Sequence, residues 1–158
     1  MAWSASGVHR ETLIDLAIKR SAALDLDAAS MFKVALFNNS VTPDPDASAA
    51  NSAYNAGTWL VANEVSNGGW SAGGLVIANL TVTAITKGFK FDGDDTANVS
   101  AATMSNIYGC HVYADAVASP VADIGFTFHY FGGSAFSVTS GSLTLQWNAS
   151  GILTMTGP

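Results

Sequence analysis

The stretch DGDD, Asp92 to Asp95, is the densest group of carboxylates in the sequence. Oxygen-rich loops of this kind bind hard cations such as calcium. The spacing does not fit the EF-hand loop, since Ala97 stands where that loop needs a glycine and Thr103 where it needs a bidentate glutamate. We therefore interpret DGDD as a solvated turn and predict no metal site, while an irregular calcium site stays open as the alternative.

Catalytic groups have little support from their spacing. The histidines His9, His111 and His129 show no metal-ligand spacing, and no G-x-S-x-G motif presents a serine nucleophile. Cys110 lies in an apolar alternating run, which predicts a small buried core residue. Glu64 stands at a probable strand end, and the sequence does not place a second acid beside it. We expect neither an enzyme nor a cofactor.

Aromatic side chains offer one binding chemistry, which is stacking on a sugar ring. The candidates for such a surface are Trp59, Trp70, Trp147, Tyr54, Phe126, Phe128, Tyr130 and Phe131. Core packing explains most of them more simply. Trp59 and Trp70 are the two that stay open as surface residues.

The chain has few charges and many apolar residues. Hydrophobic residues make up 49% of the sequence and charged residues 11%, with a formal net charge of -6. Ordinary soluble domains have roughly 25% charged residues, so part of this surface is expected to be covered by copies of the chain or by another protein. The six Lys and Arg residues are scattered, which argues against a nucleic-acid partner.

The N-terminus and the apolar runs bear on location. MAWSASGVHRETL lacks the basic start and apolar block of a secretory signal. No apolar run approaches the roughly 18 residues that span a membrane. We expect a protein made in the cytosol, with no membrane partner.

One amphipathic helix is predicted near the N-terminus, from about Gly7 to Ala23. Its apolar stripe consists of Leu13, Ile14, Ala17 and Ile18. This stripe is predicted either to form an assembly surface or to pack on the chain's own sheet.

Beyond the helix the apolar period changes to two. MFKVALF (Met31 to Phe37), LVIANLTVTAIT (Leu75 to Thr86) and NIYGCHVYA (Asn106 to Ala114) are among about nine predicted strands, and glycine-bearing turns separate many of them. Many short strands without crossover helices indicate an antiparallel β-sandwich, with a jelly roll as one possible topology. We therefore predict a mainly β protein with a helical arm over residues 1–28 and a β-sandwich domain over residues 29–158.

The stretch NEVSNGGWSAGG, Asn63 to Gly74, is predicted to be a turn between strands. Asn67-Gly68 is a strong hairpin signal, and Gly73-Gly74 allows a sharp bend. Trp70 then stands at a loop tip, where it either caps the core or inserts into an adjoining subunit. A small-ligand loop is the remaining alternative.

The order of motifs carries a family resemblance. ETLIDLAIKRSAALDLDA is followed by FKVALFNNSVTPDPD, NEVSNGGWSAGG, KFDGDDTANVSAATMSNIYGCHVYAD and SLTLQWNASGILTMT. This order resembles a family of small virion structural proteins of tailed bacteriophages, over about Glu11 to Thr156. That family shows a short helix, K-V-A-L, E-V-S-G-x-G-Y-x-A-G-G, K-F-D-A-D-D-V, A-x-Y-A-V-V-Y-x-D and a terminal W-x-x-x-G-I-L-x-L. Here Trp70 replaces the usual Tyr, Asn98-Val99 falls where a Trp is more usual, and GCH interrupts an apolar strand.

The resemblance implies a function without catalytic residues. It implies a capsid decoration or minor capsid protein that binds the outer capsid surface and stabilises the shell by bridging major capsid subunits. Its partners would be the phage major capsid protein and further copies of itself, as a homo-oligomer for which a trimer is expected. A tail or fibre-associated protein that binds a host-surface glycan is the alternative. Leu13, Ile14, Ala17, Ile18 and Trp70 are the predicted interface residues.

Overall fold

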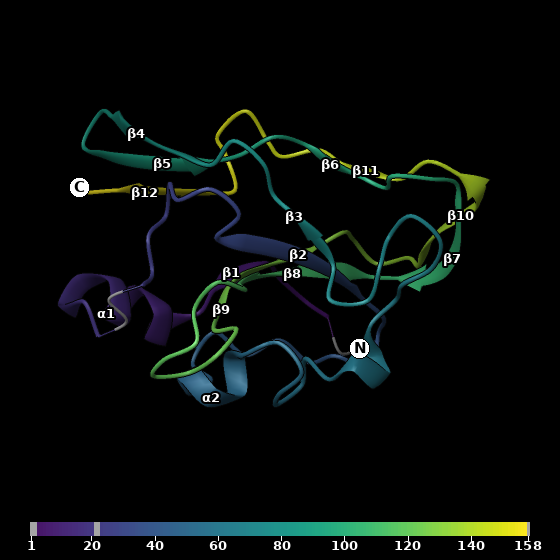
Figure 1. The fold of residues 1–158 in the computed structure, drawn as a ribbon, viewed down its shortest axis with the longest axis horizontal. Helices are drawn as coiled ribbons and strands as arrows, with labels where there is room; N and C mark the ends of the chain where they lie inside the picture. Colours follow the sequence, from purple (N-terminus) through teal and green to yellow (C-terminus); the bar gives the residue numbers. More distant parts are fainter. Residues whose placement is uncertain (1–2, 21–22, 158) are drawn as a thin grey trace.

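The protein is mainly β, with antiparallel sheets arranged as in a β-sandwich and a helix near the N-terminus. The computed structural model describes residues 3–20 and 23–157. The sheets form two main layers (Figure 1). A cluster of buried apolar side chains, which we call the main core, lies between them.

The first layer is a five-stranded sheet. Its order is β1-β9-β8-β2-β3, and every neighbouring pair is antiparallel. The strands are β1 (Gly7–Val8), β9 (Gly125–Tyr130), β8 (Gly109–Ala114), β2 (Phe32–Phe37) and β3 (Leu75–Val76).

The second layer consists of smaller antiparallel sheets. A three-stranded sheet has the order β12-β5-β4, and two-stranded pairs join β11 with β6 and β10 with β7. The strands are β4 (Thr81–Ile85), β5 (Gly88–Asp92), β6 (Thr96–Ala97), β7 (Ala102–Ile107), β10 (Phe136–Gly141), β11 (Thr144–Leu145) and β12 (Leu153–Thr156). The β10–β7 pair lies at one end of the molecule, where the two layers meet (Figure 1).

The central strands are buried on both faces. Along β2, Phe32, Val34 and Leu36 belong to the core between the layers, whereas Ala35 and Phe37 belong to a second core on the other side of the sheet. This alternation follows from the two-residue period of a strand. Fully burying one large apolar side chain contributes about 1.5–3 kcal/mol to the free energy of unfolding. Because β2 is buried on both faces, its side chains stabilise two cores.

The second core lies between the five-stranded sheet and a covering layer of turns. That layer includes the short helix α2 (Ala49–Ser52) and the 3-10 turn η1 (Val61–Asn63). Trp59 is fully buried there and stacks on His111, with 4.1 Å between ring centroids. Trp3 also joins this core, and β1 pairs with β9. Residues of the predicted N-terminal arm therefore take part in both the sheet and the core.

The N-terminal helix α1 (Arg10–Ile18) is shorter than predicted. It begins after β1 and ends where Lys19 adopts a left-handed conformation, with φ 52°. Its fully buried residues are Thr12 and Asp15 rather than the predicted apolar stripe. The Thr12 hydroxyl donates a hydrogen bond to the Gly125 carbonyl, so a polar contact fixes this face of the helix against β9.

Several local predictions differ from the structure. The predicted strand from Leu75 to Thr86 is divided into β3 and β4, and the β4–β5 hairpin turns at Thr86-Lys87. The 3-10 turn η1 lies between Trp59 and Val65, and β7 begins at Ala102, four residues before the predicted Asn106–Ala114 strand. Along β7, Ala102, Met104 and Ile107 are buried while the residues between them are exposed. The apolar side chains were thus too widely spaced to stand out against the polar residues of this segment.

Candidate interaction surface

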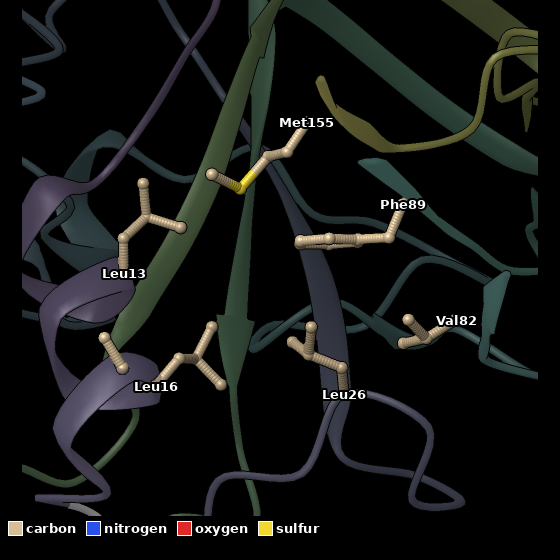
Figure 2. Close-up of a pocket in the computed structure, with 7 residues that line it drawn as sticks. Leu13, Leu16, Leu26, Val82, Phe89 and Met155 are labelled. Atoms are coloured by element: carbon tan, nitrogen blue, oxygen red, sulfur yellow. The ribbon is translucent and has the colours of Figure 1, made fainter. Parts of the chain in front are cut away.

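An open apolar hollow lies between α1 and the three-stranded sheet. It has a volume of about 380 Å3 and is open to solvent. Figure 2 shows the side chains that converge on it. They are Leu13, Leu16 and Ala17 of α1, Leu26 of the following loop, Val82 of β4, Phe89 of β5 and Met155 of β12. We call this set the apolar groove.

The strand register explains how the sheet side of the groove is formed. Phe89 lies opposite both Ala84 of β4 and Met155 of β12. Phe89 is half-buried against the main core, while Val82 remains 43% exposed and Met155 39% exposed. Apolar side chains that stay open to water side by side are typical of a surface that binds another molecule.

The four predicted stripe residues of α1 have different environments. Leu13 is half-buried against the main core and lines the apolar groove, and Ala17 is exposed and also lines it. Ile14 is half-buried, and Ile18 is 61% exposed at the end of the helix. The structure therefore brings Leu13 and Ala17 together in one surface, and places Ile14 and Ile18 outside its lining.

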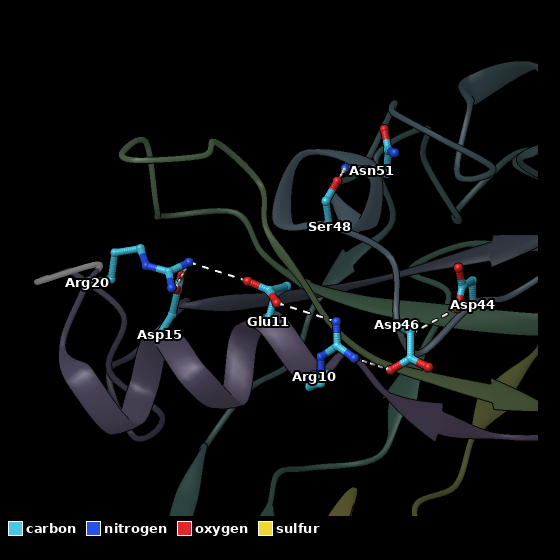
Figure 3. Close-up of polar contacts among 8 residues, drawn as sticks. All are labelled: Arg10, Glu11, Asp15, Arg20, Asp44, Asp46, Ser48 and Asn51. Carbon is cyan, nitrogen blue, oxygen red and sulfur yellow. Dashed lines mark hydrogen bonds and ion pairs between the residues drawn. The ribbon is translucent and has the colours of Figure 1, made fainter.

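Ion pairs hold the other side of α1 (Figure 3). Arg20 Nη1 lies 2.9 Å from the Asp15 carboxylate and 3.4 Å from Glu11, and Arg10 Nη1 lies 2.8 Å from Asp46. The Asp15 oxygens are buried and make no aligned hydrogen bond, so the nearby guanidinium is what compensates their charge. These contacts fix the orientation in which α1 presents Leu13 and Ala17 to the groove.

Hydrogen bonds made by half-buried and buried side chains fix the loop from Asn63 to Gly74. The Glu64 carboxylate accepts hydrogen bonds from the Tyr54 hydroxyl at 2.7 Å and from the Gly73 N–H at 2.8 Å. The Tyr113 hydroxyl donates to the Gly73 carbonyl at 2.5 Å. Desolvation raises the pKa of Glu64, and the hydrogen bonds from Tyr54 and Gly73 oppose that rise. Both carboxylate oxygens of Glu64 thus serve the loop's conformation.

Trp70 lies in the main core and not at a loop tip. Asn67 and Trp70 exchange two backbone hydrogen bonds of 3.0 Å, so Gly68 and Gly69 form the turn, one residue beyond the predicted position. The Trp70 side chain is 0% exposed. Of the two roles predicted for Trp70, capping the core is the one that this conformation allows, because a side chain without exposed surface cannot enter an adjoining subunit.

The DGDD carboxylates form an ion pair and hydrogen bonds within the chain. Asp92 forms an ion pair of 2.9 Å with Lys90, and Asp94 accepts a 2.6 Å hydrogen bond from the Asn79 side chain. Asp95 accepts from the Trp147 N–H at 2.9 Å. Among the described residues, no group of three or more His, Cys, Asp or Glu side chains could hold a metal ion.

The histidines and the cysteine lie in or near the cores. His9 and His111 are fully buried, and their ring centroids are 5.4 Å apart. Desolvation lowers the pKa of His9 to about 4 and that of His111 well below 6.5, so both rings are neutral at pH 7. Burial lowers the pKa of His129 to about 4 and raises the pKa of the Cys110 thiol.

A second hollow of about 440 Å3 contains part of the predicted aromatic surface. It is lined by Ser6, His129, Tyr130, Phe131, Leu145, Gln146, Trp147, Asn148, Gly151 and Ile152. Tyr130, Phe131 and Trp147 were all candidates for stacking on a sugar. Trp59 and Trp70, the two that stayed open as surface residues, are both fully buried, so the structure places them in the cores.

Comparisons with known proteins identify no relative of this chain. No protein-family model matches the chain, and searches of curated proteins and of solved structures found no match either. Within the described residues, no helix is long and apolar enough to cross a membrane.

Proposed function

We propose that this chain is a structural protein of a tailed-phage virion, which binds the outer capsid surface and stabilises the shell by bridging major capsid subunits. It would be made in the host cytoplasm and act on the virion as a homo-oligomer, for which a trimer is expected. The observation that carries the proposal is the open apolar groove between α1 and β4-β5-β12. The order of motifs from Glu11 to Thr156 supports it independently.

The physical basis of this binding is burial of the groove. Covering apolar surface contributes about 25 cal/mol per Å2, and the groove is lined almost wholly by carbon and sulfur atoms (Figure 2). A small contact of this kind is weak by itself. On a symmetrical shell the same contact recurs many times, and linked contacts sum to a high avidity.

Co-sedimentation with purified capsids tests the proposal. Ala17→Asp puts a charge on an exposed helix position in the groove, and we expect it to reduce capsid binding at least tenfold. Val99→Asp is the control, since Val99 is 85% exposed and does not line the groove. Equal binding by Ala17→Asp and Val99→Asp would refute a contact through the groove, and failure of the unmodified chain to bind capsids would refute the function.

The aromatic hollow favours a second candidate, a tail or fibre-associated protein that binds a host-surface glycan. Trp147 and Phe131 could stack on a sugar there, and the Gln146 and Asn148 amides could bond its hydroxyls. A glycan array probed with the unmodified chain and with Phe131→Ala tests this candidate. Phe136→Ala, which removes a 50% exposed ring elsewhere, is the control. Absence of any array signal, or a signal unchanged by Phe131→Ala, would contradict glycan binding in this hollow.

A further inference from the structure

Strand β4 is an unprotected edge. Its sequence TVTAI has no charge and no proline, and all five residues from Thr81 to Ile85 are exposed. It pairs with β5 without a bulge, and β5 is its only strand neighbour in the described ranges. Proteins usually protect exposed edges with charged side chains, proline or bulges, because an open edge is a template for pairing with another strand.

The hairpin fixes which backbone groups of β4 face outward. The two-residue turn Thr86-Lys87 makes Ile85 and Gly88 the pair that closes it. In an antiparallel ladder the bonded residues alternate, so Ile85, Thr83 and Thr81 direct their N–H and C=O groups to β5. Val82 and Ala84 therefore direct theirs to the open side.

We infer that β4 is a self-association surface, on which a second copy of this chain pairs its own β4 antiparallel about a two-fold axis at Thr83. This register sets Val82 of each copy opposite Ala84 of the other, and each such pair exchanges both of its N–H···O bonds. The outward-facing backbone groups of one copy thus bond those of the other. Thr83 faces its own equivalent at the axis as a non-hydrogen-bonded pair.

Charges at the two ends of β4 favour this arrangement. Lys87 follows one end, and Asn79 precedes the other at an equal distance from Thr83 along the chain. The Asn79 side chain bonds the exposed carboxylate of Asp94 at 2.6 Å. Antiparallel pairing therefore brings each Lys87 toward the Asp94 side of the other copy, which offsets part of the repulsion between two chains of net charge -6.

The side chains of β4 favour a second copy for a further reason. Val82 lies opposite the buried Phe91, and Ala84 opposite Phe89 of the apolar groove. Both therefore face the groove side of the sheet. A two-fold axis perpendicular to the sheet leaves the groove side of both copies facing in the same direction. The two grooves therefore become neighbours on one continuous sheet. The contact gives a dimer, or joins two trimers where the protein is trimeric.

Sedimentation velocity of the full chain across micromolar concentrations tests the inference. We expect the unmodified protein to show the self-association, and Thr83→Lys to halve the mass of the largest species, because two lysines would meet at the axis. Thr156→Lys makes the same change on β12, the other edge of the same sheet, and should leave the mass unchanged. The inference would be overturned if the unmodified protein were monomeric, or if both variants had the same mass. A monomeric unmodified protein would leave a strand of another protein as the partner of β4.

A cysteine variant provides a second measurement, because a disulfide makes even a weak association covalent. Non-hydrogen-bonded partners in an antiparallel pair have Cα atoms about 4.5 Å apart, which is within the range that a disulfide spans. Mild oxidation with diamide, which accepts the two hydrogens of the thiols, should link Thr83→Cys into a covalent dimer and leave Thr156→Cys unlinked. The natural Cys110 is buried and should not react. Failure of Thr83→Cys to link would contradict the two-fold register.

Both measurements use the purified chain without capsids. If they show no pairing of β4, the proposed capsid binding through Ala17 still stands. If the chain does not bind capsids, the proposed pairing of β4 still stands.

Discussion

The hydroxyl of Tyr54 donates a 2.7 Å hydrogen bond to the carboxylate of Glu64, which also accepts from the Gly73 N–H. The Tyr54 ring stacks on Tyr113, with 4.7 Å between centroids, and Tyr113 bonds the same glycine. Two aromatic rings and one carboxylate thus fix the glycine-rich loop, although the sequence separates them widely.

Glu64→Ala should destabilise the fold. It leaves the Gly73 N–H and the Tyr54 hydroxyl without their acceptor, and an unsatisfied group of this kind costs about 1–3 kcal/mol. Urea unfolding followed by tryptophan fluorescence measures the change. Asp25→Ala, at an exposed position, is the control. If Glu64→Ala unfolds at the same urea concentration as the unmodified chain, the hydrogen bonds to Glu64 do not stabilise the loop.

Gly74→Ala should be more destabilising than Gly132→Ala. Both glycines have positive φ, +76° and +107°, so a side chain strains the backbone at each. Only at Gly74 would the added Cβ also meet protein, at 2.1 Å from the Val34 carbonyl oxygen, since nothing lies within 4 Å of it at Gly132. Thermal unfolding should show a lower Tm for Gly74→Ala, and equal Tm values would mean that β2 moves aside without cost.

Trp70→Ala should cost about 3–5 kcal/mol, the usual loss for removing a large buried aromatic side chain. Trp70 is fully buried in the main core, so the loss should appear in the free energy of unfolding of the isolated protein. Phe136→Ala, at a half-exposed ring, should change it by less than about 1 kcal/mol. A stable Trp70→Ala protein that associates poorly would instead favour the predicted subunit contact.

Stability should fall as the pH drops from about 6.5 toward 4. Desolvation lowers the pKa values of His9 and His129 to about 4 and lowers that of His111 well below 6.5. In this window the unfolded chain binds protons that the folded chain does not, so the slope of unfolding free energy against pH is positive, by up to about 1.4 kcal/mol per pH unit for each histidine. Glu64, with its raised pKa, acts in the opposite direction by losing stability as the pH rises.

Urea unfolding at several pH values measures this slope. His9→Asn removes one titrating ring and keeps a side chain suited to the start of α1. Its slope between pH 6.5 and 5 should be smaller than that of the unmodified chain. An unchanged slope would mean that His9 becomes protonated in the folded protein as readily as in the unfolded one.

The sequence predicted the fold class because strand periodicity is a local property. β2 lies within the predicted Met31–Phe37 strand, and its alternating burial follows directly from residue order. The groove could not be predicted in the same way. Its lining joins Leu13, Val82 and Met155, which come from distant parts of the chain, and no periodic pattern relates them.

The errors on α1 and Trp70 have one cause. Sequence reasoning assigned apolar residues to the helix contact and put a glycine-flanked tryptophan at a loop tip, where it either caps the core or enters an adjoining subunit. In the structure the helix buries Thr12 and Asp15 because the Gly125 carbonyl and Arg20 provide partners for them. The glycines beside Trp70 form a tight turn, and this turn directs the ring inward. Both outcomes depend on partners that are remote in the sequence.

The pairing of β1 with β9 has a consequence for synthesis of the protein. The backbone N–H of Tyr130 bonds the Ser6 hydroxyl across 124 residues of chain, and Gly7 pairs with Phe128. A growing chain on the ribosome therefore holds its first strand unpaired, with Trp3 exposed, until most of the sequence has emerged. Contacts between such distant residues slow folding, so we expect the fold to be completed after translation, with the start of the chain among the last segments to dock.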